Sequence, residues 1–187
     1  MVKAIVCVTG MPGSGKTLVA RCLSDRLGAY VSMGDVVRSR AAELGIEPTS
    51  ENLARLAQEI RREFGPDVVA REVSKSFGSL SGVVVVDGVR SLDEVSYFSR
   101  IAPTVVVAVH ASPRTRFERL RRRGREDDPH AYSSFLERDR GELELGLGSA
   151  IALADIVVVN EGRNPEEVCD EALRKILGVL SGVLTQG

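Results

Sequence analysis

The feature that most constrains the fold is a glycine-rich segment that matches the pattern GxxxxGK[ST] in full. It consists of Gly10, Met11, Pro12, Gly13, Ser14, Gly15, Lys16 and Thr17. An apolar stretch at residues 3–9 precedes it, and an amphipathic stretch at residues 18–27 follows it. Such a strand–loop–helix unit points several backbone N–H groups, and the positive end of a helix, at one anion. The segment therefore predicts that these eight residues bind the phosphates of a nucleoside triphosphate.

Three side chains of this predicted site have separate roles. Lys16 can reach the β- and γ-phosphates, and the hydroxyl of Thr17 is placed to ligate Mg²⁺. A valine-rich run at residues 83–86 ends in Asp87, an acid that can hold a magnesium-bound water beside Thr17. The sequence thus predicts Mg²⁺ as the cofactor, with a nucleoside triphosphate as substrate. Guanine-binding proteins usually carry an Asn-Lys-x-Asp element, which this chain lacks, and this favours ATP.

Short β-branched runs alternate with stretches of helical period along the whole chain. The runs are apolar throughout rather than alternating, as in strands buried on both faces of a parallel sheet. They comprise residues 3–9, 29–32, 82–87, 104–110 and 155–160. We therefore predict an α/β fold in which a doubly wound, parallel five-stranded sheet carries helices on both faces. Nothing suggests a linker, and residues 1–187 are expected to form a single P-loop domain.

Helix starts can also be read from the sequence. Ser91 and Glu94 make a capping box ahead of a helix at 92–101, and Ser112 and Asn164 each precede a proline at a first helical position. Further helices are expected at about 50–64, and from Pro66 to about 77.

Residues 112–154 break the alternation, because they are mostly helical and polar and contain no predicted strand. Insertions of this kind are commonly mobile lids. The segment is rich in arginine, with nine residues between positions 114 and 140: Arg114, Arg116, Arg119, Arg121, Arg122, Arg123, Arg125, Arg138 and Arg140. Most of them fit a solvated helix face, but a few can stabilise charge during phosphoryl transfer. We favour Arg119, Arg123, Arg138 and Arg140 as catalytic.

Two further arginines follow predicted strands and suit a second substrate. Arg38 lies early in a helix that starts near residue 33, close to Asp35, and Arg90 follows Asp87 by three residues. A guanidinium fork matches a phosphate well, and the carboxyl ends of parallel strands meet at one edge of the sheet. Residues 33–78 are therefore expected to form a helical acceptor-binding region that includes Asp35 and Arg38.

Composition limits the partners and the compartment. A net charge of −1 gives no bulk attraction to nucleic acid, although the arginine-rich segment leaves RNA binding open. No apolar run is long enough to span a membrane, and a signal peptide would have to consume the glycine-rich loop. Cys7, Cys22 and Cys169 lack metal-ligand spacing, so they are expected to be reduced thiols of a cytoplasmic protein.

The motifs GMPGSGKT, GDVVR and DGVR, in this order, resemble those of adenylate kinase and related nucleoside monophosphate kinases. The C-terminal third is more similar to dephospho-coenzyme A kinase, through Ala111-Ser112-Pro113 and the last strand, 154–160. The combination, with residues 137–143, resembles an archaeal group of P-loop kinases.

The resemblance implies that Arg38 and Arg90 hold the phosphate of an acceptor, and that Asn160 and Glu161 lie near the adenine. It also implies that Asp35 acts as base if the acceptor is a hydroxyl. Adenylate kinases have phenylalanine and proline where this chain has only Val89, and dephospho-coenzyme A kinases lack the DGVR arginine. A phosphate acceptor and a hydroxyl acceptor therefore both stay open.

Two functions follow from the sequence. The first is an ATP-dependent small-molecule kinase that transfers the γ-phosphate to a nucleotide or nucleotide-like acceptor, such as a nucleoside monophosphate or a dephospho-coenzyme A-like molecule. The alternative is a kinase-like ATPase whose nucleotide state controls docking to RNA or to a protein. The oligomeric state does not follow from the sequence.

Overall fold

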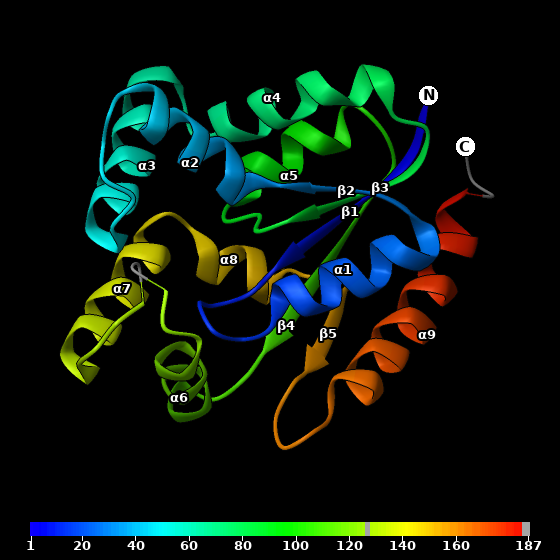
Figure 1. The fold of residues 1–187 in the computed structure, drawn as a ribbon. Helices are drawn as coiled ribbons and strands as arrows, with labels where there is room; N and C mark the ends of the chain where they lie inside the picture. The colour runs from blue at the N-terminus through cyan, green and yellow to red at the C-terminus, as the bar shows by residue number, and fades with distance from the viewer. Residues whose placement is uncertain (126–127, 185–187) are drawn as a thin grey trace.

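A computed structural model describes residues 1–125 and 128–184 of the chain; residues 126–127 of the arginine-rich segment and the terminal 185–187 lie outside the described part. Its centre is a sheet in which every strand pairs in parallel with its neighbours, in the order β2-β3-β1-β4-β5 (Figure 1). The strands are β1 Val2–Thr9, β2 Gly28–Ser32, β3 Gly82–Asp87, β4 Thr104–His110 and β5 Ile156–Val159. The predicted five-stranded parallel sheet is confirmed, with strand bounds within one residue of those expected.

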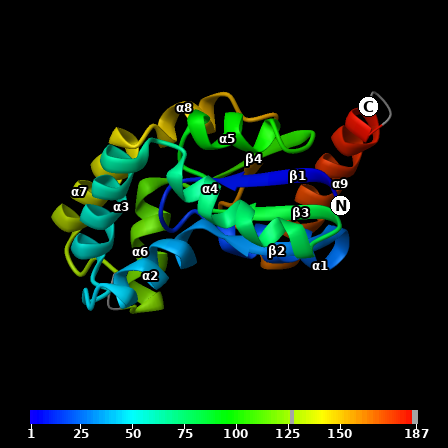
Figure 2. The same ribbon diagram turned by 90° about the horizontal axis from the view of Figure 1, so that it is seen from above.

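Helices cover both faces of this sheet. On one face lie α1 (Lys16–Leu27) and α9 (Pro165–Leu184), and on the other lie α4 (Val68–Ser74), α5 (Leu92–Ser99) and α8 (Leu147–Ala152) (Figures 1 and 2). The remaining helices gather beyond the carboxyl ends of the strands: α2 (Met33–Glu43), α3 (Ser50–Phe64), α6 (Pro113–Arg123) and α7 (Tyr132–Glu144). A short 3₁₀ helix, η1 (Lys75–Ser79), follows α4.

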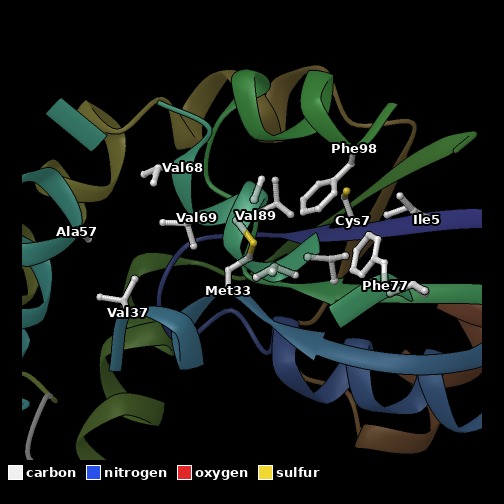
Figure 3. Packing of buried hydrophobic residues seen from close by; sticks show 14 of the residues in the cluster. Ile5, Cys7, Met33, Val37, Ala57, Val68, Val69, Phe77, Val89 and Phe98 are labelled. Carbon is white, nitrogen blue, oxygen red and sulfur yellow. The ribbon is translucent and has the colours of Figure 1, made fainter. Parts of the chain in front are cut away.

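The valine-rich strands are apolar on both faces because each face supports its own core. On the α5 face, Cys7 of β1 packs with Phe77 and Phe98, whose stacked rings lie 5.9 Å apart (Figure 3). On the α1 face, Val6 of the same strand packs with Leu23 of α1 and with α9. Successive residues of a strand point to opposite faces, so a strand between two helical layers carries no polar alternation.

The predicted helix starts are largely confirmed. Thr49, Ser91 and Ser112 each cap a helix by accepting a hydrogen bond from the backbone N–H three residues later. Glu94, in contrast, does not close the expected box on Ser91: its buried carboxylate accepts from the backbone N–H of Arg90 and from the guanidinium of Arg61. Two bounds also differ from expectation, because α5 ends at Ser99 and the helix after Pro66 begins at Val68.

The prediction of three reduced thiols is wrong for two of the cysteines. A disulfide joins Cys22 of α1 to Cys169 of α9, across 147 positions of sequence, while Cys7 is a free thiol buried under α5. Sequence spacing gives no sign of this bond, because only the packing of α1 against α9 brings the two Cα atoms to 5.9 Å.

Within residues 1–125 and 128–184, none of the helices combines the length and the apolar character needed to cross a membrane.

Removal of the disulfide should destabilise the fold. The bond closes a long loop, between residues 147 positions apart, so Cys169→Ser is expected to lower the free energy of unfolding by about 2–4 kcal/mol. Chemical denaturation of the variant and the wild type measures this difference. A reducing agent should lower the wild type to the level of the variant and leave the variant unchanged. Equal stability of the two proteins without reductant would contradict the prediction.

Candidate nucleotide and acceptor site

The carboxyl ends of β1, β2 and β3 form the edge on which the candidate site is built. Asp87, the last residue of β3, pairs in register with Val8 of β1 on one side and Ser32 of β2 on the other. The N–H groups of Gly88 and Val89 both donate to the carbonyl of Val8. The segment from Asp87 to Arg90 is therefore fixed next to the glycine-rich loop that follows β1.

The loop itself needs glycine at two tightly packed positions. Gly15, the N-cap of α1, has φ 96°, and a Cβ there would lie 2.2 Å from Nδ2 of Asn160. Gly13 has φ 80°, and a Cβ there would lie 2.7 Å from the carbonyl oxygen of Arg116. Both positions combine a left-handed backbone with a neighbour too close for any side chain. The loop is thus held between α6 and the end of β5.

Asn160 and Arg119 bind this loop through its backbone. The buried side chain of Asn160 donates from Nδ2 to the carbonyl of Ser14 at 2.9 Å. Arg119 donates to both the carbonyl and the side-chain oxygen of Asn160, at 3.0 and 3.1 Å. Asn160 therefore joins the phosphate loop to α6. The sequence predicts a position near the adenine for Asn160, but it does not predict this contact.

Arg116 clamps the same loop from the interior of the protein. Its guanidinium makes two hydrogen bonds to the carboxylate of Asp139, at 2.6 and 2.8 Å, and donates to the carbonyl of Pro12 at 3.1 Å. It also lies over the ring of Phe135. A buried arginine with a bidentate partner holds its geometry firmly, so α6, α7 and the loop are connected through this one side chain.

Asp87 lies where a magnesium site requires an acid. Its Oδ2 accepts hydrogen bonds from the hydroxyls of Thr17 at 2.7 Å and Tyr30 at 2.9 Å. Its Oδ1 is buried and has no hydrogen-bond partner among the residues that the structure describes. A buried carboxylate oxygen left without a donor is costly, and a cation or its bound water would satisfy it. The residues present therefore fit Mg²⁺, with Thr17 and Asp87 as the groups that would hold it.

The ammonium of Lys16 lies among other charges. Burial lowers its pKa to about 8, even though the carboxylates of Glu142 and Asp87 favour its charged form; Arg90 and Arg138 lower it further. An ammonium that is incompletely neutralised by the protein is ready to bind an anion. The charge balance around Lys16 thus favours a bound phosphate.

Arg90 is held beside Lys16 from two directions. Its Nε donates to Glu142 of α7 at 2.7 Å, and its backbone N–H donates to Glu94 of α5 at 2.7 Å. The charge of Glu142 raises the pKa of Arg90. Burial alone would raise the pKa of Glu142, but Arg90, Lys16 and Arg138 together lower it. Glu142 is therefore a carboxylate anion inside a cationic site, and it connects α7 to the end of β3.

Asp35 and Arg38 form a more exposed pair on α2. Arg38 donates to Oδ1 of Asp35 at 2.7 Å, and the two side chains are 46% and 64% exposed. Each of them lines a different cavity. Asp35 lines one of about 320 Å³ with Tyr30, and Arg38 lines another of about 310 Å³ with Arg125; neither cavity is lined by Arg90. Arg38 and Arg90 therefore do not line the same one of these two cavities.

The favoured arginines of residues 112–154 have different surroundings. Arg123 and Arg138 both pair with the buried carboxylate of Asp128, whereas Arg140 is exposed on α7. Arg138 also affects the pKa values of Lys16 and Glu142, so its charge acts on the centre of the site. Of the described residues in this segment none forms a strand, as predicted.

Sequence reasoning missed four residues of this site: Tyr30, Arg116, Asp128 and Glu142. Tyr30 lies in the short second strand and carries no motif; burial and then Asp87 raise its pKa to about 12. In the sequence, Glu142 is only part of residues 137–143, which resemble an archaeal group of P-loop kinases. Glu142 pairs with Arg90, 52 positions away, and so leaves no local pattern, although an acid four residues after Arg138 in an arginine-rich segment is a weak signal for it.

Fold and site together define a P-loop protein. The model of a family described as AAA domain matches residues 6–142. A UPF0200 protein of Hyperthermus butylicus is 52% identical over 184 residues, covering 96% of both chains. The UPF0200 protein TK1334 of Thermococcus kodakarensis is 45% identical, covering 92% of this chain and 100% of its own. The chain belongs to this UPF0200 family of P-loop proteins, in agreement with the archaeal resemblance of its sequence.

Solved structures with lower sequence identity share the fold. The structure of TT1252 from Thermus thermophilus is 21% identical, with a TM-score of 0.66, and covers 96% of this chain and 99% of its own. A gluconokinase of Sinorhizobium meliloti is 20% identical at a TM-score of 0.58, covering 99% and 97%. Shikimate kinase of Aquifex aeolicus is 16% identical at 0.56, covering 94% and 98%. At these identities the likeness establishes the fold alone.

The pKa of Lys16 predicts how nucleotide affinity depends on pH. Phosphates stabilise the charged ammonium, so above pH 8 binding must be accompanied by proton uptake. We expect the affinity for ATP to fall as pH rises above 8, approaching about tenfold per pH unit. Calorimetric titration between about pH 7 and 9 measures the slope. Lys16→Arg stays charged throughout and should remove the slope; a wild-type affinity that is independent of pH would refute the prediction.

The unpartnered Oδ1 of Asp87 predicts that substitution of this residue weakens the effect of Mg²⁺ on ATP binding. Asp87→Asn should reduce the gain in ATP affinity that Mg²⁺ gives by about 10–100-fold, because a group that holds a metal-bound water loses its charge. ATP affinity without Mg²⁺ should change little. Tyr30→Phe is the matched control, since it removes a hydrogen bond to the same carboxylate and keeps the charge. A similar loss in both variants would argue against a metal role for Asp87.

Proposed function

We propose that this chain is an ATP-dependent kinase that transfers the γ-phosphate to a nucleotide or nucleotide-like acceptor. The observation that carries the proposal is Arg90, which Glu142 holds beside Lys16. Its Nη2 group has no partner among the described residues, so it is free to bind an anion next to the triphosphate. Kinases among the solved structures with this fold, a gluconokinase and a shikimate kinase, support a transfer reaction.

Each part of the site then has a task. The backbone of residues 10–17 would cradle the phosphates of ATP, Lys16 would neutralise the transferred group, and Thr17 with Asp87 would hold Mg²⁺. The metal would supply charge neutralisation at the phosphate oxygens. Arg90 would orient the acceptor, and Arg138 would stabilise charge during transfer. Asn160 and Arg119 would keep the loop in its binding conformation. Backbone atoms near Asn160 would contact the adenine.

Residues 112–154 would serve as the lid and residues 33–78 as the acceptor-binding region of this single domain. Arg116 anchors α6 and, through Asp139, α7 to the phosphate loop, so the two helices would move together on closure. The Arg90–Glu142 contact joins α7 to the end of β3. We propose that this contact transmits acceptor binding to the lid, with Arg123 and Arg140 approaching the phosphates only in the closed form.

A kinase-like ATPase that docks RNA or a protein is the second candidate. The observation in its favour is the outer face of α6, where Arg114, Arg121 and Arg122 are exposed. Such a face can bind a phosphate backbone, with strong dependence on salt. This form of the proposal requires slow hydrolysis of ATP without any acceptor, accelerated by the partner.

An acceptor screen with labelled ATP tests the kinase. It should cover nucleoside monophosphates and dephospho-coenzyme A, and we expect labelled product from at least one of them. Glu142→Gln should raise the KM for that acceptor by about tenfold, because Arg90 loses a charged partner. Transfer to none of these acceptors, together with partner-stimulated hydrolysis, would favour the ATPase.

The same assay separates the two acceptor types. If the acceptor is a hydroxyl, Asp35→Asn should reduce kcat by about 10²–10⁴-fold, because a general base is lost. If the acceptor is a phosphate, which needs no base, kcat should stay within a few-fold of the wild type. Near-normal turnover of the variant would therefore exclude Asp35 as the base.

A further inference from the structure

A cavity between α2, α3 and the end of α6 lies outside the cluster around Lys16. It has a volume of about 310 Å³ and is lined by Arg38, Pro48, Leu53 and Arg125. This is the size of a small ligand site. Two guanidinium groups from distant parts of the sequence and two apolar side chains thus face the same space.

Arg38 is available to a ligand in this cavity. Its guanidinium pairs with Asp35, and both side chains of that pair are about half exposed or more. An exposed ion pair of this kind contributes little, about 0–1 kcal/mol. An anion with two or three oxygens can therefore replace or share the contact at low cost.

A hydrogen bond of its backbone N–H, and not an ion pair of its guanidinium, positions Arg125 at the cavity. Its N–H donates to Oδ2 of the buried Asp128 at 3.0 Å, and the same carboxylate binds Arg123 and Arg138. The acid is thus already neutralised by two other arginines. Among the residues that the structure describes, no acid pairs with the guanidinium of Arg125. The backbone of Arg125 is thus held in place, and its side chain lines the cavity.

We propose that this cavity is an anion subsite for a second charged group of the acceptor, distinct from the group that is phosphorylated. The lining contains neither Lys16 nor Asp87 nor Arg90, which form the transfer site. An anion held by Arg38 and Arg125 is therefore an anchor and not the reacting group. The pair departs from the expectation that Arg38 and Arg90 share a single acceptor phosphate.

The subsite narrows the class of acceptor, and in this respect it rests on the proposed kinase function. The acceptor carries a phosphate group at the Arg38–Arg125 end, where a guanidinium fork recognises the oxygens. Pro48 and Leu53 contribute an apolar wall for the adjoining carbon skeleton. The phosphorylated product then carries phosphate groups at two separate positions, or a phosphate chain extended away from the anchor.

Inorganic phosphate is the probe for the subsite itself. We would saturate the phosphate loop with Mg²⁺ and a non-hydrolysable ATP analogue, and then titrate phosphate by calorimetry at constant ionic strength. Arg125→Ala and Arg38→Ala should each weaken phosphate binding by about tenfold or more, since each removes charge-assisted hydrogen bonds. Arg122→Ala is the matched control, because it removes an exposed arginine of α6 that does not line the cavity, and it should bind phosphate as the wild type does.

The outcomes separate the subsite from the kinase. If Arg125→Ala binds phosphate as tightly as Arg122→Ala and the wild type do, the subsite proposal is overturned. This holds whatever the result of the acceptor screen. Loss of phosphate binding in Arg125→Ala supports the subsite even if no acceptor is phosphorylated, in which case the kinase proposal alone fails. For an acceptor found in the screen, Arg125→Ala should raise KM about tenfold with little change in kcat. An unchanged KM shows that this acceptor is not anchored at the cavity and overturns the assignment of the class.

Discussion

The hydrogen bond between Thr17 and Asp87 joins the two strands on which the site depends. Thr17 lies in the first turn of the helix after β1, and Asp87 ends β3, seventy positions later. Because β1 and β3 are neighbours in a parallel sheet, their carboxyl ends meet at one edge. The same contact leaves the second oxygen of Asp87 buried and unpartnered among the described residues, so the edge is shaped for a cation. The remaining charges of the site are arranged around this pair.

Charge balance, more than shape, describes what the site is prepared to bind. Lys16 is acted on by the carboxylates of Glu142 and Asp87 and by the cations Arg90 and Arg138, and Arg138 also pairs with Asp128. Burial makes each unneutralised cation expensive, which is why the pKa of Lys16 falls to about 8. A triphosphate with its metal relieves this cost. Glu142 places a carboxylate among these cations and holds Arg90 in a defined position.

The arginine-rich segment is less uniform than its composition implies. Arg116 is a buried structural clamp, Arg119 supports the phosphate loop, and Arg123 and Arg138 share the carboxylate of Asp128. The outward-facing arginines of α6 are the ones that fit the solvated face expected from the sequence. The helix α6 thus contains a buried structural arginine, arginines that contact the site and solvent-exposed arginines. Their roles are distinguished only by the residues that they contact.

The sequence by itself determined the sheet, the phosphate loop and the places where strands end. Valine runs without alternation require two covered faces, glycine is needed where φ is positive, and capping residues act within three positions. These are local effects, so they can be read from the chain. The pairing of Cys22 with Cys169, of Arg90 with Glu142, and of Arg116 with Asp139 was decided only in the tertiary structure. Their partners lie 23 to 147 positions apart, and side chains at such separations meet only after the helices have packed on the sheet.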